Sequence, residues 1–138
     1  MSYKLFILFP ILVIYLSACK PVSTGDSAKV VKSGYPAIIE FDELERDFGK
    51  ITEGEKVGWY FKYRNAGESD LLISNVITTC GCTVSEYSKK PLSPGGEEEL
   101  QIIFDSSGRK GKEIKNVKIE SNAQNNIVNL KLIFEVIN

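Results

Sequence analysis

The two thiols in the segment Thr79-Cys80-Gly81-Cys82-Thr83 are the side chains of this sequence best suited to chemistry. In a regular strand the Cα atoms of Cys80 and Cys82 would lie about 6.6 Å apart, with their Cβ atoms pointing the same way. That separation is near the upper limit for a disulfide, so a bridge requires a bend in the backbone. Gly81 is the candidate hinge, because a residue without a Cβ atom bends readily.

Three uses of this thiol pair remain open. Cys80 and Cys82 can form a structural staple, either as a disulfide or as two packed small side chains. A bridge across one residue would be strained, which favours exchange of disulfides with a partner protein. The pair can also bind a metal. Zinc prefers four ligands and the chain contains no histidine, so Cu(I) held by two thiolates is the less demanding possibility.

The absence of histidine also bears on catalysis. A cysteine nucleophile in a hydrolase usually needs an imidazole base, and this chain has none to offer. Its carboxylates are scattered along the sequence rather than arranged in an acid and base pair. The sequence therefore predicts a protein without catalysis and without a cofactor, leaving thiol redox chemistry at Cys80 and Cys82 as the open exception.

The N-terminal segment has the layout of a secretory signal, with Lys4, an apolar run and then small residues, and it is too short for an ordinary membrane span. Its last residues, Leu16-Ser17-Ala18-Cys19, resemble the lipobox of a bacterial lipoprotein. That resemblance implies cleavage before Cys19, lipid on that cysteine and attachment to a membrane. Lys20 follows the lipid site instead of aspartate, which favours the outer membrane, with the domain facing the periplasm.

The remaining chain divides into a tether and one domain. We expect a signal peptide at residues 1–18, a lipidated N-terminus and flexible tether at 19–36, and a domain at 37–138. Cleavage leaves 120 of the 138 residues, with 16 of the 17 basic side chains against 18 acidic ones. This slightly acidic balance, without a basic block, makes nucleic acid an unsuitable partner.

Apolar residues of the domain recur with a period of two, which indicates strands. Turn signals rich in glycine, proline, serine and asparagine separate the runs, and no stretch of helical period interrupts them. The pattern predicts an all-β antiparallel sandwich of about seven to eight strands. The predicted core consists of Trp59, Phe61, Leu100, Ile102, Phe104, Val117, Ile119, Leu130, Leu132 and Phe134.

One segment breaks this period. Leu71 and Ile73 are at odd positions, whereas Val76 and the two cysteines that follow are at even ones. A regular strand cannot turn all of them to one side. We therefore expect a β-bulge at Ser74-Asn75.

Several short motifs together resemble the bacterial family called domain of unknown function 1573, over roughly residues 37–136. Cys80-Gly81-Cys82-Thr83 is the sharpest of them; the others are Asp47-Phe48-Gly49-Lys50-Ile51, Glu53-Gly54-Glu55, Phe61 with Asn65 and Gly67, Leu71-Leu72-Ile73, Pro94-Gly95-Gly96 and Ser121-Asn122. The resemblance implies an immunoglobulin-like sandwich similar to those of the hydin and major sperm protein groups, often carried by a lipoprotein.

The sequence thus favours a lipid-anchored module of the cell envelope that binds a protein partner. An anchor and a tether place a rigid sandwich without giving it chemistry, and such sandwiches commonly bind through loops or added strands. The alternative is Cu(I) handling or thiol-disulfide exchange at Cys80 and Cys82.

Overall fold

A computed structural model describes residues 34–81 and 83–138 and confirms the predicted all-β fold. The signal segment, Cys19, the tether up to residue 33, and Cys82 lie outside the described residues. No helix in the described part has the length and apolarity needed to cross a membrane. The strands are β1 (Ile39–Phe41), β2 (Glu45–Thr52), β3 (Lys56–Asn65), β4 (Ile73–Thr78), β5 (Thr83–Glu86), β6 (Glu97–Asp105), β7 (Gly111–Ser121) and β8 (Ile127–Ile137).

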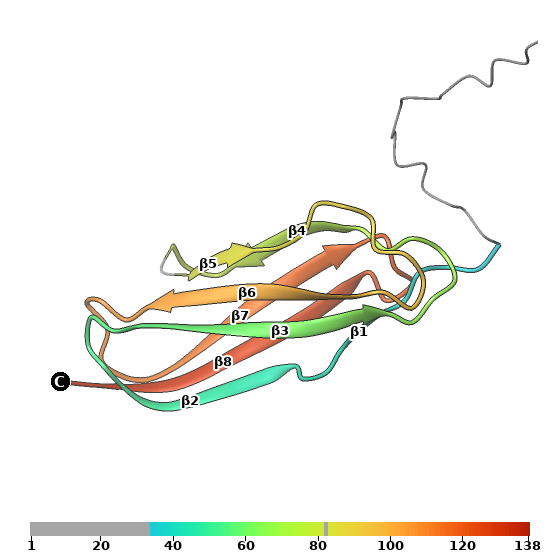
Figure 1. Ribbon diagram of the computed structural model, residues 1–138. Helices are drawn as coiled ribbons and strands as arrows, with labels where there is room; N and C mark the ends of the chain where they lie inside the picture. Colours follow the sequence, from blue (N-terminus) through green and yellow to red (C-terminus); the bar gives the residue numbers. More distant parts are fainter. Residues whose placement is uncertain (1–33, 82) are drawn as a thin grey trace, which may run out of the picture.

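The strands form two four-stranded sheets packed face to face (Figure 1). Sheet A has the order β1-β3-β6-β5, and sheet B has the order β2-β8-β7-β4. All neighbouring pairs are antiparallel except β2 and β8, which run parallel. The chain leaves the edge of sheet A after Phe41 and joins the edge of sheet B at Glu45 without reversing. The parallel pair is therefore a local departure from the expected antiparallel sandwich.

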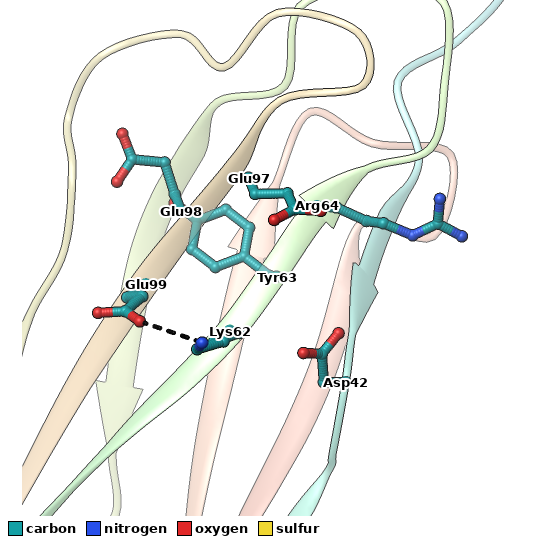
Figure 2. Close-up of a pocket in the computed structure, with 7 residues that line it drawn as sticks. All are labelled: Asp42, Lys62, Tyr63, Arg64, Glu97, Glu98 and Glu99. Carbon is teal, nitrogen blue, oxygen red and sulfur yellow. Dashed lines mark ion pairs between the residues drawn. The ribbon is translucent and has the colours of Figure 1, made fainter.

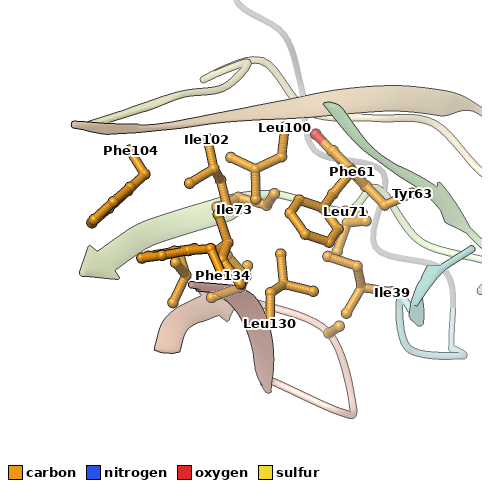
Figure 3. Packing of buried hydrophobic residues seen from close by; sticks show 14 of the residues in the cluster. Ile39, Phe61, Tyr63, Leu71, Ile73, Leu100, Ile102, Phe104, Leu130 and Phe134 are labelled. Carbon is orange, nitrogen blue, oxygen red and sulfur yellow. The ribbon is translucent and has the colours of Figure 1, made fainter. Parts of the chain in front are cut away.

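The core lies between the two sheets, and the alternation of apolar residues fills it as predicted (Figure 3). Phe104 of sheet A and Phe134 of sheet B meet with ring centroids 4.1 Å apart. Of the predicted core residues, all but Trp59 are buried; Trp59 is half-buried and packs against the cluster from the side.

Trp59 of β3 lies at the side of the sandwich next to β2, where it contacts Arg46 and Glu43. The guanidinium carbon of Arg46 lies 3.5 Å from the Trp59 ring centroid, and the indole N–H donates to a carboxylate oxygen of Glu43. Arg46 pairs in register with the buried Leu132, so its stem enters the sandwich and its planar head covers the indole. These contacts close the side between β2 and β3 with a cation rather than another apolar residue.

The predicted bulge is confirmed. The register of β4 against β7 shifts between Ile73 and Asn75, and this places Ile73 in the core and Val76 in packing contact with it. β4 then ends at Thr78. Cys80 and Gly81 therefore lie in a turn beyond the strand rather than on its continuation.

The buried side chain of Asn65 holds together the end of the sandwich where the chain enters. Asn65 is fully buried; its Oδ1 accepts from the amides of Ile38 and Gly67, at 3.5 and 3.0 Å, and its Nδ2 donates to the carbonyls of Ser69 and Leu92, at 2.8 and 2.9 Å. One side chain thus ties two loops to the segment that enters the domain.

Candidate functional site

The cysteine motif forms the corner at which the chain passes from sheet B to sheet A. Thr78 ends β4 at the edge of sheet B, and Thr83 begins β5 at the edge of sheet A. The Thr78 hydroxyl lies 3.2 Å from the carbonyl of Cys80 and 3.4 Å from that of Thr83, so it can donate to either. We call residues 78–83 the cysteine corner. The Thr78 hydroxyl thus bonds the backbone of this short turn.

Cys80 is disulfide-bonded in this structure, and its sulfur is not a thiolate. Its partner lies outside the described residues, so a bridge between Cys80 and Cys82 stays a prediction. The sulfur of Cys80 lies 3.6 Å from the Thr83 hydroxyl, which must donate because a disulfide sulfur carries no proton. Over residues 34–81 and 83–138 there is no group of three histidine, cysteine or carboxylate side chains placed to hold a metal.

Gly81 lies at the exposed tip of the turn. A Cβ atom added there would meet nothing within 4 Å, and its φ is not in the left-handed region. The space around Gly81 would therefore accept alanine in the conformation that the structure shows.

The cysteine corner lies at the end of the sandwich opposite the entry of the chain (Figure 1). We call this the distal end; it also carries the turns that follow β2 and β6. The buried hydroxyl of Ser106 lies 2.8 Å from the carbonyl of Thr52 and 2.9 Å from that of Glu55, and the Gly108 amide donates to Glu53 at 2.8 Å. These hydrogen bonds join the turn after β2 to the turn after β6.

Replacing Thr78 by valine should loosen the cysteine corner. The change removes one hydroxyl that bonds the turn and costs about 1 kcal/mol of stability. We expect faster amide exchange around residues 79–81 and faster reduction of the Cys80 disulfide by dithiothreitol. Thr79→Val, at an exposed neighbouring position, is the matched control. Equal reduction rates in both variants would show that the Thr78 hydroxyl does not hold the turn.

Asp105 makes the distal end sensitive to acid. Hydrogen bonds from Ser107, together with Lys56 at 3.3 Å, lower the pKa of Asp105 from 3.8 to about 2. Because the folded pKa is depressed, this stabilisation is present above about pH 4 and is lost as the pH falls towards 2. In urea melts, Asp105→Asn should be less stable than the wild type at pH 5, and the two should converge near pH 2. A constant difference across this range would contradict the assignment.

The outer face of sheet B exposes several isoleucines. The register places Ile77 of β4 opposite Lys118, and Ile114 of β7 opposite Ile133, on the side facing away from the core. Ile114 is 61% exposed, the most of any large aliphatic side chain described. The other exposed isoleucines of this face are Ile77, Ile127 and Ile137. We call this surface the isoleucine face.

A hollow of about 390 Å³ lies on the isoleucine face. Ile114 and Ile133 contribute to its apolar part, and its charged lining residues are of both signs: Lys50, Lys112, Asp47, Glu113 and Glu135. It forms where β2 bulges between Asp47 and Lys50, with Gly49 in the left-handed conformation at φ 67°. The Asp47-Phe48-Gly49-Lys50 motif thus shapes a hollow beside exposed apolar surface.

A second hollow, of about 230 Å³, lies on sheet A and is strongly polar (Figure 2). It surrounds Tyr63, whose pKa rises to about 12 through burial and the nearby Glu98 carboxylate. Lys62 and Glu99 form an ion pair of 3.9 Å across it. The remaining lining residues are Asp42, Arg64 and Glu97. Four carboxylates and two cations line this hollow, so acidic side chains outnumber basic ones there.

Sequence reasoning identified the cysteine corner but missed the isoleucine face. A signal for it was present, since Ile114 is out of phase with the buried Val117 and Ile119 of the same strand. An apolar residue on the polar side of a strand indicates an exposed contact. Cys19 lies outside the described residues, and nothing in the structure bears on its lipidation.

Comparison with solved structures defines the class of fold. The PapD-like domain 7 of human CEP192 superimposes with a TM-score of 0.62 at 13% identity, covering 91% of this chain and 99% of that one. A protein of unknown function from Porphyromonas gingivalis W83 gives 0.63 at 22% identity, covering 72% of this chain and 46% of that one. The secreted serine protease VesC of Vibrio cholerae gives 0.55 at 16%, covering 71% and 23%. These likenesses show a PapD-like, immunoglobulin-like sandwich.

The chain spans less than half of the Porphyromonas protein and about a quarter of the Vibrio protease, so the likeness concerns one part of each. No curated protein matches the sequence. The model of the family described as Protein of unknown function (DUF1573) matches residues 39–136, which is most of the chain. The chain belongs to this family, and the resemblance drawn from its motifs is confirmed.

Proposed function

We propose that this chain is a lipid-anchored protein-binding module of the bacterial cell envelope, without catalysis or a cofactor of its own. Lipid on Cys19 would hold it in the outer membrane, and the sandwich would dock a protein partner in the periplasm. The cysteine corner would shape one end of the docking surface.

The observation that carries the proposal is the isoleucine face. Ile114 is 61% exposed and Ile77 is 43% exposed, on the outer side of a four-stranded sheet. Ile114 and its cross-strand neighbour Ile133 line the hollow on this face, and exposed apolar side chains beside a hollow are typical of a protein contact. The PapD-like fold supports the same role, because sandwiches of this kind offer sheet faces and strand edges to partners.

The position of the distal end supports a tethered arrangement. The sixteen residues from Lys20 to Tyr35 reach about 50 Å when fully extended. The chain enters the sandwich at one end, while the cysteine corner lies at the other (Figure 1). An anchor on Cys19 would therefore join the sandwich at its entry end and leave the distal end accessible to a partner.

The anchor has a direct test. Cys19→Ser removes the proposed lipid site, and we expect the variant to move from the detergent phase to the aqueous phase in detergent partitioning of cell extracts. The wild-type chain should stay in the detergent phase. Retention of the serine variant with the membrane would contradict the lipid anchor.

The docking role is tested by photo-cross-linking in intact cells. A photoreactive amino acid replaces Ile114 on the isoleucine face in one strain and Lys62 on the outer side of sheet A in a matched strain. We expect Ile114 to yield an adduct of defined mass with one envelope protein, identified by mass spectrometry, and Lys62 to yield little. If neither position nor a wider scan of the surface yields a protein adduct, the chain is not a docking module.

A further inference from the structure

Strand β7 extends well beyond its neighbour β4. It pairs with β8 from Gly111 to Glu120, whereas β4 pairs with it only from Val117 to Ser121. The chain turns into the cysteine corner after Thr78 and crosses to sheet A. Among the described strands, residues 111–116 of β7 therefore have a neighbour on one side only. We call this stretch the open edge.

An open edge presents unpaired amide and carbonyl groups that accept a further strand. Natural proteins usually protect such edges with charged side chains that point inward or outward. Here the inward charges are neutralised by each other, since Lys115 bonds Glu113 at 2.5 Å and their side chains are only 12% and 22% exposed. On the outward side the open edge presents Lys112 and the exposed Ile114. Ile114 is therefore the exposed apolar side chain that this edge offers to a further strand.

Three cations lie beside the open edge, where Lys112 stands opposite Glu135 of β8 in the register. Arg109 and Lys110 lie in the turn that leads into β7, and Lys112 follows on its outer side. None of the three forms an ion pair with a carboxylate of the described residues, whereas Lys115 and Lys118 both do. Three cations without an ion pair next to a free strand edge attract an acidic segment.

We propose that the open edge accepts an extended acidic segment of a partner protein as an additional strand of sheet B. This assumes the proposed role as a protein-binding module and gives that module a contact site. Main-chain hydrogen bonds along residues 111–116 supply the binding. An acidic side chain faces Lys112, and an apolar one packs on Ile114.

A second copy of this chain is a poorer occupant of the same edge. In an antiparallel pairing of two open edges, Arg109, Lys110 and Lys112 of the two copies would lie at opposite ends of the new strand pair, so the pairing would give these cations no acidic segment to bind. An anionic membrane would satisfy the charges but leave the backbone groups of the edge unpaired. The combination of free backbone and positive charge favours an acidic strand.

The probe is a synthetic peptide of sequence Thr-Glu-Thr-Val-Thr-Glu-Thr-Val-Thr-Glu, blocked at both ends, mixed with the purified full chain in detergent micelles. It presents glutamate and valine alternately on one face. A matched peptide carries N-methyl groups on alternate residues, which remove its ladder donors but keep its charge. Hydrogen exchange of the protein is followed by mass spectrometry, and affinity by fluorescence anisotropy.

We expect the plain peptide to slow exchange at residues 111–116, and the methylated peptide to bind at least about tenfold more weakly. Ile114→Glu should lower the affinity about tenfold, and Lys112→Gln about threefold. Leu44→Glu, at an exposed aliphatic position outside the isoleucine face, and Lys90→Gln should leave it unchanged.

Several results would overturn the proposal. Equal affinity for both peptides, protection away from residues 111–116, or no binding would each exclude strand addition at this edge. A concentration-dependent dimer lost in Ile114→Glu would show that a second copy occupies it. Binding to phosphatidylglycerol vesicles that Lys112→Gln abolishes, without peptide binding, would assign the cations to a membrane. Envelope cross-links from other positions would still support the docking role after each of these failures.

Discussion

Asn65→Ala should lower the free energy of unfolding by about 3 kcal/mol, one of the two largest effects that we expect from single substitutions. The Asn65 side chain is fully buried and makes four hydrogen bonds to backbone groups. Alanine leaves those groups without this partner, and each buried polar group so stranded costs about 1–3 kcal/mol. Urea denaturation followed by fluorescence of Trp59, the only tryptophan, measures the change.

The matched control is Asn75→Ala. Asn75 is exposed, and its amide donates to the Glu120 carboxylate at 3.1 Å, so we expect a loss below about 0.5 kcal/mol. If Asn65→Ala were as mild as this control, the loops at the entry end would not depend on the Asn65 side chain.

Gly67→Ala should be comparably damaging for a different reason. A Cβ atom at Gly67 would lie 2.4 Å from the carbonyl oxygen of Pro36, 2.5 Å from the amide nitrogen of Ile38 and 2.6 Å from the Cα of Ala37. All three are backbone atoms, so no side chain can move aside. The entering segment must shift and lose its hydrogen bonds with the Asn65-Gly67 loop, at a cost of about 2–4 kcal/mol.

Limited proteolysis separates this effect from general unfolding. We expect Gly67→Ala to be cleaved within residues 34–40 at urea concentrations where the rest of the sandwich is still folded. Gly34→Ala is the control, because a Cβ atom there would meet nothing within 4 Å. Cleavage of Gly67→Ala at the wild-type rate would mean that the entering segment tolerates the added methyl group.

Much of the fold could be predicted from the sequence because a half-buried sheet imposes its period on the chain. Phe104 and Phe134 were placed in the core by alternation alone, and both are buried against each other. The bulge at Ser74-Asn75 followed from the same rule, since a one-residue change of phase needs one extra residue. These inferences depend only on local spacing.

Other features depend on which strands become neighbours, and local spacing does not specify that. The parallel pairing of β2 with β8 requires the chain to change sheets after Phe41. The contact of Arg46 with Trp59 joins strands of different sheets. The open edge exists because β4 ends at Thr78, opposite Val117, whereas β7 extends beyond that point as far as Gly111. To predict it, one must know the register between the two strands as well as their lengths.

The motifs that identify the family fall into structurally different groups. Asn65, Gly67 and Pro94-Gly95-Gly96 meet at the entry end, where the Asn65 amide donates to Gly96 at 3.0 Å and the Gly95 amide donates to the Asn65 carbonyl at 2.8 Å. A Cβ atom on Gly96 would lie 2.7 Å from the Leu92 side chain. These residues maintain loop geometry, whereas Cys80 and Gly81 lie at the distal end.

The central claim is that the chain docks a partner and that its cysteine corner is structural. Its most direct test is mass spectrometry of the full chain isolated from its native envelope without reductant, after alkylation of free thiols. We predict an intact intramolecular bridge between Cys80 and Cys82 with no bound metal. Stoichiometric copper on two free thiols, or mixed disulfides with other envelope proteins, would contradict the claim and assign chemistry to the corner.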